Sequence, residues 1–179
     1  SINMQIGINA SKVCDVTTGV GRYTYNLRKS ILRTNGKNNY HFYVPGNVSN
    51  FIEAGGSEIQ LGNPETAIQN NTLRILWEQT FLPVYSRRDK LDLFHYTDHA
   101  LSLVQTTRPT IITVHDIAYV RFPNLLNKSR QFYKKKILRI SMQRADIIVA
   151  DSFSTKRDII EYYGVKEKKI RVVHLGVES

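Results

Sequence analysis

The sequence has one cysteine and no long apolar segment. Because Cys14 is alone among 179 residues, no intrachain disulfide can form and a metal cluster held by several thiolates is excluded. No apolar run approaches the roughly 20 residues that a membrane-spanning helix needs. The N-terminus also lacks the basic region and apolar stretch of a signal peptide. These absences favour a globular protein of a reducing compartment, and we expect it in the cytoplasm.

Acidic residues are scarce relative to basic ones. The chain has 25 Lys and Arg against 15 Asp and Glu, which gives a formal net charge of +10. This balance favours anionic partners such as nucleic acid, anionic lipid or phosphorylated substrates, or it reflects a solvated basic surface. With 41% hydrophobic residues the chain is long enough for one domain with a sizeable core.

Short β-type runs alternate with helical runs along the chain. This alternation implies parallel strands joined by right-handed crossovers, so the predicted fold class is α/β with a Rossmann-like, doubly wound, mainly parallel sheet. In the first helix Val20, Tyr23, Leu27 and Ile31 share one face, and Pro83 is expected to bend or break the second helix. We expect strands at residues 4–9, 40–44, 57–61, 91–95, 110–114, 146–150 and 170–173, and helices at 20–34, 71–86, 127–144 and 154–163.

Two glycines, Gly19 and Gly21, stand at the predicted start of the first helix, followed by Arg22 and Tyr23. In an open parallel sheet, ligands bind beyond the carboxyl ends of the strands. Free N–H groups at a helix start suit a phosphate, although a tight turn that needs glycine dihedrals is the alternative. A dinucleotide-binding turn would require a third glycine where Thr24 stands and an acid about 20 residues later. A nicotinamide oxidoreductase is therefore the weaker interpretation.

His115 and Asp116 follow the predicted strand at 110–114. An imidazole at a strand end can donate a hydrogen bond or a proton near neutral pH. Asp116 would either orient His115 or hold a loop, and a purely structural histidine is the alternative. Ser152 stands between a strand and a helix, where capping is the preferred role and ligand contact a secondary one.

Tyr96, Asp98 and His99 follow the strand predicted at 91–95, together with His95. Two histidines and an acid suggest a metal, but the spacing fixes no third ligand, so no metal site is expected. We expect Tyr96, Asp98 and His99 to shape a substrate pocket, to which Asp116 and Ser152 would also contribute.

The helix predicted at 127–144 is basic and contains no acid. Tyr133, Ile137 and Ile140 follow helical spacing and are expected to pack on the sheet. Lys134, Lys135 and Lys136 would then project outward toward an acidic acceptor or an anionic membrane surface, with an ordinary solvated face as the equal alternative. The positive charges of this segment are Lys128, Arg130, Lys134, Lys135, Lys136, Arg139 and Arg144.

Four segments in register, at residues 19–23, 77–83, 113–117 and 145–154, carry a family resemblance. With them the chain resembles, over residues 4–177, the N-terminal domain of the retaining family 4 glycosyltransferases, which have the GT-B architecture. The segment from Trp77 to Pro83 is most similar to mannosyltransferases that build surface polysaccharide such as O-antigen.

The resemblance implies two Rossmann-like domains that face each other across a cleft. The first holds a saccharide or lipid-linked acceptor, and the second holds the nucleotide-diphosphate sugar, which is a substrate, so no cofactor is implied. Gly19 and Gly21, with Arg22 and Tyr23, correspond to the loop near the donor phosphates and the acceptor. His115 corresponds to a histidine that positions the transferred sugar and stabilises its charge. No nucleic-acid motif is present, so a nucleic-acid partner is not expected.

The same resemblance sets the expected domain boundaries. Residues 1–3 are interpreted as an expression remnant, 4–173 as the acceptor-side domain and 174–179 as the start of an interdomain linker. The donor-binding domain would lie outside these residues. The expected activity is hexosyl transfer with retention at the inner face of a membrane, with mannose as the sugar that the resemblance favours. The isolated chain is expected to be inactive.

Overall fold

The computed structural model describes residues 3–13, 17–34, 36–45, 48–53, 55–60, 70–104, 109–121 and 128–176. The chain divides into two units, each considered by itself. The first comprises Ser1–Thr97 and Ser102–Pro109, and the second Asp98–Leu101 and Thr110–Ser179.

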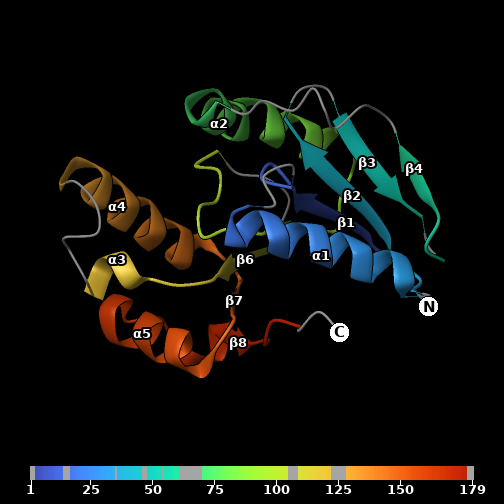
Figure 1. Cartoon of the computed structure of the whole chain (residues 1–179). Helices are drawn as coiled ribbons and strands as arrows, with labels where there is room; N and C mark the ends of the chain where they lie inside the picture. Colours follow the sequence, from blue (N-terminus) through green and yellow to red (C-terminus); the bar gives the residue numbers. More distant parts are fainter. Residues whose placement is uncertain are drawn as a thin grey trace. The chain divides into compact units, whose positions relative to one another are not determined.

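The first unit holds a mixed sheet in which β1 lies between two parallel neighbours (Figure 1). Ile6 of β1 is in register with Tyr40 of β2 and with Leu93 of β5. β3 pairs with β2, and β4 with β3, both antiparallel. The strands are β1 (Gln5–Asn9), β2 (Asn39–Val44), β3 (Val48–Ile52), β4 (Glu58–Gln60) and β5 (Leu93–Tyr96).

The antiparallel edge corrects the sequence prediction in two ways. β3 was not expected, and the strand expected at 57–61 is present as β4 but does not run parallel to its neighbour. Only residues 45–47 separate β2 from β3, whereas a parallel crossover needs a dozen residues or more. A connection this short can only reverse the chain.

Two long helices belong to the first unit, α1 (Gly19–Arg33) and α2 (Asn71–Arg88). Leu27 and Ile31 of α1 pack against a core that includes Ile8 and Phe42, which confirms the predicted inward face of α1 at these two positions. The α2 helix begins at an N-cap, Asn70, whose side chain accepts hydrogen bonds from the N–H groups of Thr72 and Leu73. It continues past Pro83, so the predicted break does not occur there.

The second unit has three parallel strands in the order β6, β7, β8, in which β7 pairs with both of the others. α4 connects β6 to β7 and α5 connects β7 to β8, which is the β-α-β arrangement of a Rossmann-like fold (Figure 1). The predicted α/β class is therefore confirmed. The elements are β6 (Thr110–Val114), α3 (Ala118–Arg121), α4 (Lys128–Arg144), β7 (Ile147–Ala150), α5 (Phe153–Tyr163), a 3-10 turn η3 (Glu167–Lys169) and β8 (Ile170–Val172).

The buried face of α4 differs from the predicted one. Leu138, Ser141 and Met142 are fully buried at spacings of three and four, whereas Ile137 and Ile140 are only half-buried. The side chain of Tyr133 lies outside the described residues. As a result Lys136 is exposed, while Lys134 and Lys135 are half-buried and do not project freely.

None of the helices in the described ranges has the length and apolar character needed to cross a membrane.

Candidate functional site

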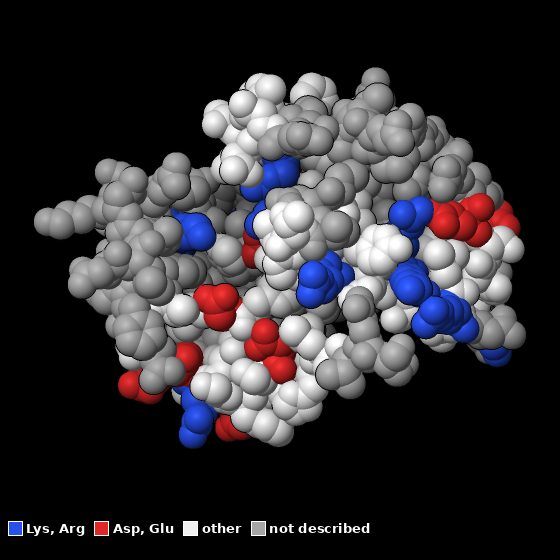
Figure 2. Space-filling model, viewed as in Figure 1, with Lys and Arg blue, Asp and Glu red and all other residues white. Residues whose placement is uncertain are grey.

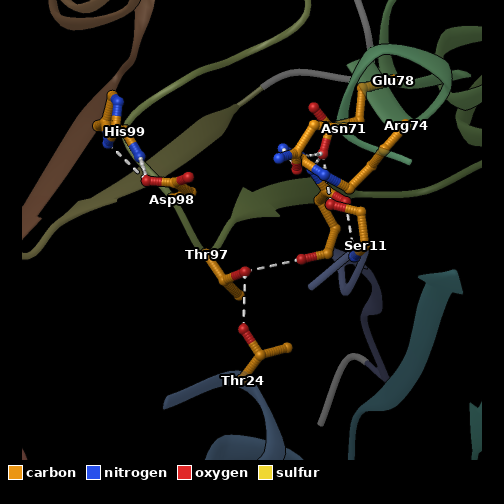
Figure 3. Close-up of polar contacts among 9 residues, drawn as sticks. Ser11, Thr24, Asn71, Arg74, Glu78, Thr97, Asp98 and His99 are labelled. Atoms are coloured by element: carbon orange, nitrogen blue, oxygen red, sulfur yellow. Dashed lines mark hydrogen bonds and ion pairs between the residues drawn. The ribbon is translucent and has the colours of Figure 1, made fainter. Parts of the chain in front are cut away.

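A polar network occupies the carboxyl end of β1 (Figure 3). Asn9, the last residue of β1, accepts a hydrogen bond at Oδ1 from the N–H of Ser11, at 3.1 Å, which turns the chain after the strand. Thr97 Oγ1 donates to the carbonyl of Asn9 at 2.8 Å, and Thr24 Oγ1 donates to Thr97 Oγ1 at 3.0 Å. The network thus joins the ends of β1 and β5 to the first turns of α1.

A buried carboxylate, Glu78 of α2, reaches the same strand end. Its Oε1 accepts hydrogen bonds from Asn9 Nδ2, at 3.4 Å, and from Ser11 Oγ. Arg74 Nη1 pairs with the same oxygen at 2.8 Å, and Arg74 Nη2 reaches Asn71 Oδ1 at 3.5 Å. The side chains of Arg74 and Glu78 are only 13% and 11% exposed. Burial of a charge costs several kcal/mol, and these donors offset that cost.

Glu78 and Arg74 were not among the predicted site residues. The spacing of four residues predicts that the two can pair on a helix face. It does not predict that this face is buried against the end of β1, because that depends on the packing of α2.

The glycine turn begins α1. Thr18 is its N-cap and accepts the hydrogen bond of the Gly21 N–H at Oγ1, at 3.1 Å. A Cβ added at Gly19 would meet no atom within 4 Å. Within the described residues no acceptor bonds the Gly19 N–H. The Gly21 N–H is not free as predicted, because it satisfies the cap.

The surroundings of this turn are basic. Figure 2 shows Lys and Arg side chains gathered along α1, and the sequence of the helix contains no acid. Arg22, in the first turns, is exposed, and Tyr23 is half-buried. Arg22 and the helix dipole favour an anion near the start of α1, whereas Lys29 and Arg33 lie toward its other end and Arg28 pairs with Glu58. The basic residues of α1 are Arg22, Arg28, Lys29 and Arg33.

In the second unit, His115 directly follows β6 and is half-buried. Its Nδ1 lies 3.9 Å from Asp151 Oδ2, which is ion-pair range if the imidazole is protonated but too long for a hydrogen bond. Thr155 Oγ1 donates to the His115 carbonyl at 3.2 Å and to Asp151 Oδ1 at 2.9 Å. Asp116 instead accepts from the Ala118 N–H at 3.0 Å. Of its two predicted roles, Asp116 therefore holds a loop, and Asp151 is the carboxylate beside His115.

Ser152 caps α5, as predicted, by accepting a hydrogen bond from the Thr155 N–H at 3.1 Å.

Asp98 and His99 contact each other directly. Asp98 accepts the N–H of His99 at 2.7 Å and pairs with the ring nitrogen Nδ1 of the same residue. The structure therefore gathers His115, Asp151 and Ser152 within the second unit, which also holds Asp98 and His99.

Tyr96 does not lie where a pocket residue is expected. It is 1% exposed, and its ring lies 4.8 Å from that of Phe94. The two residues are two positions apart in β5 and so share one face of the sheet. This packing places Tyr96 in the core rather than in a pocket.

A separate polar cluster ties the end of α2 to β2. Tyr43 donates to Asp89 Oδ2 at 2.7 Å, and Arg88 pairs with Oδ1 of the same carboxylate. Burial and the hydrogen bond to Asp89 raise the pKa of Tyr43 far above its usual range. Burial acts to raise the pKa of Asp89, but hydrogen bonds from Arg88 and Tyr43 outweigh it and lower that pKa. Burial likewise lowers the pKa of His41. The cluster keeps Tyr43 neutral and anchors the helix.

Among the described residues, no three His, Cys, Asp or Glu side chains gather in a way that would hold a metal ion.

A family model described as "Glycosyltransferase Family 4" matches residues 17–179, which is nearly the whole chain. No curated protein matches the chain.

Proposed function

The chain belongs to glycosyltransferase family 4, and we propose that it forms the acceptor-side part of a retaining hexosyltransferase. The donor would be a nucleotide-diphosphate sugar, and the acceptor a saccharide or a lipid-linked saccharide. The family match over residues 17–179 is the observation that carries this proposal. It supports glycosyl transfer and offers no support to the oxidoreductase or nucleic-acid alternatives.

The start of α1 supports a role toward the donor diphosphate. Transfer leaves a nucleoside diphosphate, whose developing charge is stabilised by N–H groups and basic side chains aimed at it. The uncommitted N–H of Gly19, the open space at its Cα and the basic surface of α1 suit such a group. Gly21, Arg22 and Tyr23 belong to the same turn, in which the N–H of Gly21 donates to Thr18 Oγ1.

His115 is proposed to lie against the transferred sugar. It stands at a strand end and is half-buried, and its Nδ1 lies 3.9 Å from Asp151 Oδ2. A protonated imidazole can donate a hydrogen bond and stabilise negative charge that leaves with the diphosphate. Asp98, His99 and Ser152 are weaker candidates for contacts to the substrate.

The finer assignment to mannose and to surface polysaccharide rests on the segment from Trp77 to Pro83, whose pattern is that of polysaccharide mannosyltransferases. We also propose that the acceptor is presented at an anionic membrane surface. The basic helix α4 motivates this second point.

The experiment is a transfer assay with the natural enzyme. It would be incubated with GDP-mannose, UDP-glucose or UDP-galactose and with lipid-diphosphate saccharides as acceptors, and the anomeric configuration of the product would be read by NMR. Transfer with an α-linked product from an α-linked donor is expected. A β-linked product would overturn the retaining assignment, and the absence of transfer to every saccharide, with reduction of a nicotinamide cofactor instead, would overturn the proposal.

A further inference from the structure

We propose that Glu78 binds the saccharide acceptor by accepting a hydrogen bond from one of its hydroxyl groups, an inference that rests on the proposed function. The three donors to this carboxylate, from Asn9, Ser11 and Arg74, all converge on Oε1. Within the described residues no donor bonds Oε2. Glu78 is 8% exposed as a residue and 11% exposed at its side chain, so the carboxylate is not fully closed off from solvent.

The position of this oxygen favours a ligand. Asn9 ends β1 and Ser11 follows it, so Glu78 is held beyond the carboxyl end of a central parallel strand. Ligands of open α/β sheets bind at that end. A link between α2 and β1 needs no charge, and a buried ion pair stabilises a fold little more than neutral packing does. The three donors to Oε1, from Asn9, Ser11 and Arg74, instead hold the carboxylate so that Oε2 has a fixed direction. A binding group requires such a fixed direction.

The chemistry of the cluster indicates which ligand it takes. Arg74, at 2.8 Å, neutralises the carboxylate, so a cation gains little there. A phosphate would be repelled by the remaining lone pairs of Oε2. A neutral hydroxyl fits, because an O–H donor to a carboxylate makes a short, charge-assisted hydrogen bond. A sugar presents several such hydroxyls, and Glu78 would select the one that reaches Oε2. Asn9, Ser11 and Arg74 are positioning residues in this arrangement.

The test is a double-mutant cycle between protein and ligand. The probes are the methyl glycosides of D-mannose, D-glucose and D-galactose and the monodeoxy form of each at every ring hydroxyl, with affinities measured by ligand-observed NMR titration. Glu78→Gln should weaken the preferred glycoside by about 10- to 100-fold, the range expected for a hydrogen bond to a charged group. One deoxy analogue, which lacks the hydroxyl bound by Glu78, should bind the wild type as weakly as the parent glycoside binds Glu78→Gln. The substitution should not change the affinity for this analogue.

Glu161→Gln is the matched control, because it makes the same chemical change at an exposed position of α5; it should leave every affinity unchanged. If Glu78→Gln fails to fold, as judged by thermal melting, Glu78→Asp takes its place, since it keeps the charge but withdraws the oxygen by one methylene.

Two results would overturn the inference. If the wild type binds glycosides and the folded Glu78 variant discriminates among the deoxy analogues as the wild type does, Glu78 is structural and the proposed function stands. If the wild type neither binds glycosides nor transfers sugar to any saccharide, the proposed function falls and the inference with it.

Discussion

Two carboxylates lie beyond the carboxyl ends of parallel strands, one in each unit, and they are held in different ways. Glu78 is nearly buried, and Oε1 collects donors from Asn9, Ser11 and Arg74. Asp151 is more exposed, accepts one hydroxyl bond from Thr155, and lies 3.9 Å from His115. The first arrangement fixes a direction in space, whereas the second leaves an imidazole whose attraction to the carboxylate depends on its protonation.

This difference separates two tasks that a transferase must perform. A ligand that is recognised by shape needs a rigid hydrogen-bonding group, and a network of satisfied buried polar groups provides one. Under the proposed function, charge that develops during transfer would be met by a hydrogen-bond donor, the role proposed for His115. Substitutions in the two clusters should therefore affect stability and rate in opposite proportions.

The largest effect is expected from His115→Ala in the natural enzyme. Loss of one donor to developing charge commonly lowers kcat by about 10²- to 10³-fold, or about 2.7–4 kcal/mol, while the melting temperature should change little. Steady-state kinetics and thermal melts of the same variant measure both. His174→Ala is the control, because it removes another imidazole of the same unit, an exposed one that contacts the Asp151 carbonyl, at 3.2 Å, and the ring of Phe153. A folded His115→Ala enzyme with wild-type rate would remove His115 from the mechanism.

Stability should depend more on Glu78 than on Asp151. Glu78→Ala leaves the buried Arg74 charge without its partner, so the free energy of unfolding should fall by about 3 kcal/mol. Asp151→Ala removes one hydroxyl bond and a long ion pair, and should cost about 1 kcal/mol. Urea unfolding of both variants tests this ordering, and equal losses would contradict the contrast between a tight and a loose cluster.

Substitution of Gly19 in the glycine turn should lower the affinity for the donor without lowering the stability of the fold. Gly19→Ala adds a Cβ where nothing lies within 4 Å, so folding should be unaffected. The added methyl group should, however, hinder the close approach of a diphosphate. Donor affinity should therefore fall about tenfold, or about 1.4 kcal/mol. Gly164→Ala is the converse control: Gly164 has φ +63°, so alanine should cost about 1 kcal/mol of stability without affecting the donor. Calorimetric titration with the nucleotide sugar and thermal melts provide the two measurements. Unchanged donor affinity in Gly19→Ala would identify the turn as purely structural.

The smallest effect concerns α4. Lys136 is its one exposed lysine among Lys134, Lys135 and Lys136, so Lys136→Gln should weaken binding to anionic vesicles about fivefold, equivalent to about 1 kcal/mol. High salt should abolish the difference. Co-sedimentation with anionic and with neutral vesicles measures it, and Lys166→Gln, in an exposed loop of the same unit, is the control. Binding that ignores lipid charge would leave α4 as an ordinary solvated surface.

Local rules predicted a large part of this protein. The strand at 110–114 matches β6, Ser152 caps α5, and Leu27 and Ile31 face the core. Each of these follows from residues a few positions apart, through β-branching, hydroxyl capping and helical spacing.

The α/β alternation and the family motifs could be read from the amino-acid order alone, because each depends on a short segment of the chain. Only the tertiary structure decided that β4 lies antiparallel, that Leu138 rather than Ile137 is the buried position of α4, and that Tyr96 belongs to the core. It also decided that Asp151, not the adjacent Asp116, stands beside His115, and that Glu78 is buried against Asn9. These outcomes depend on contacts between segments tens of residues apart, and the burial and partners of a polar side chain are set by that packing rather than by its neighbours along the chain.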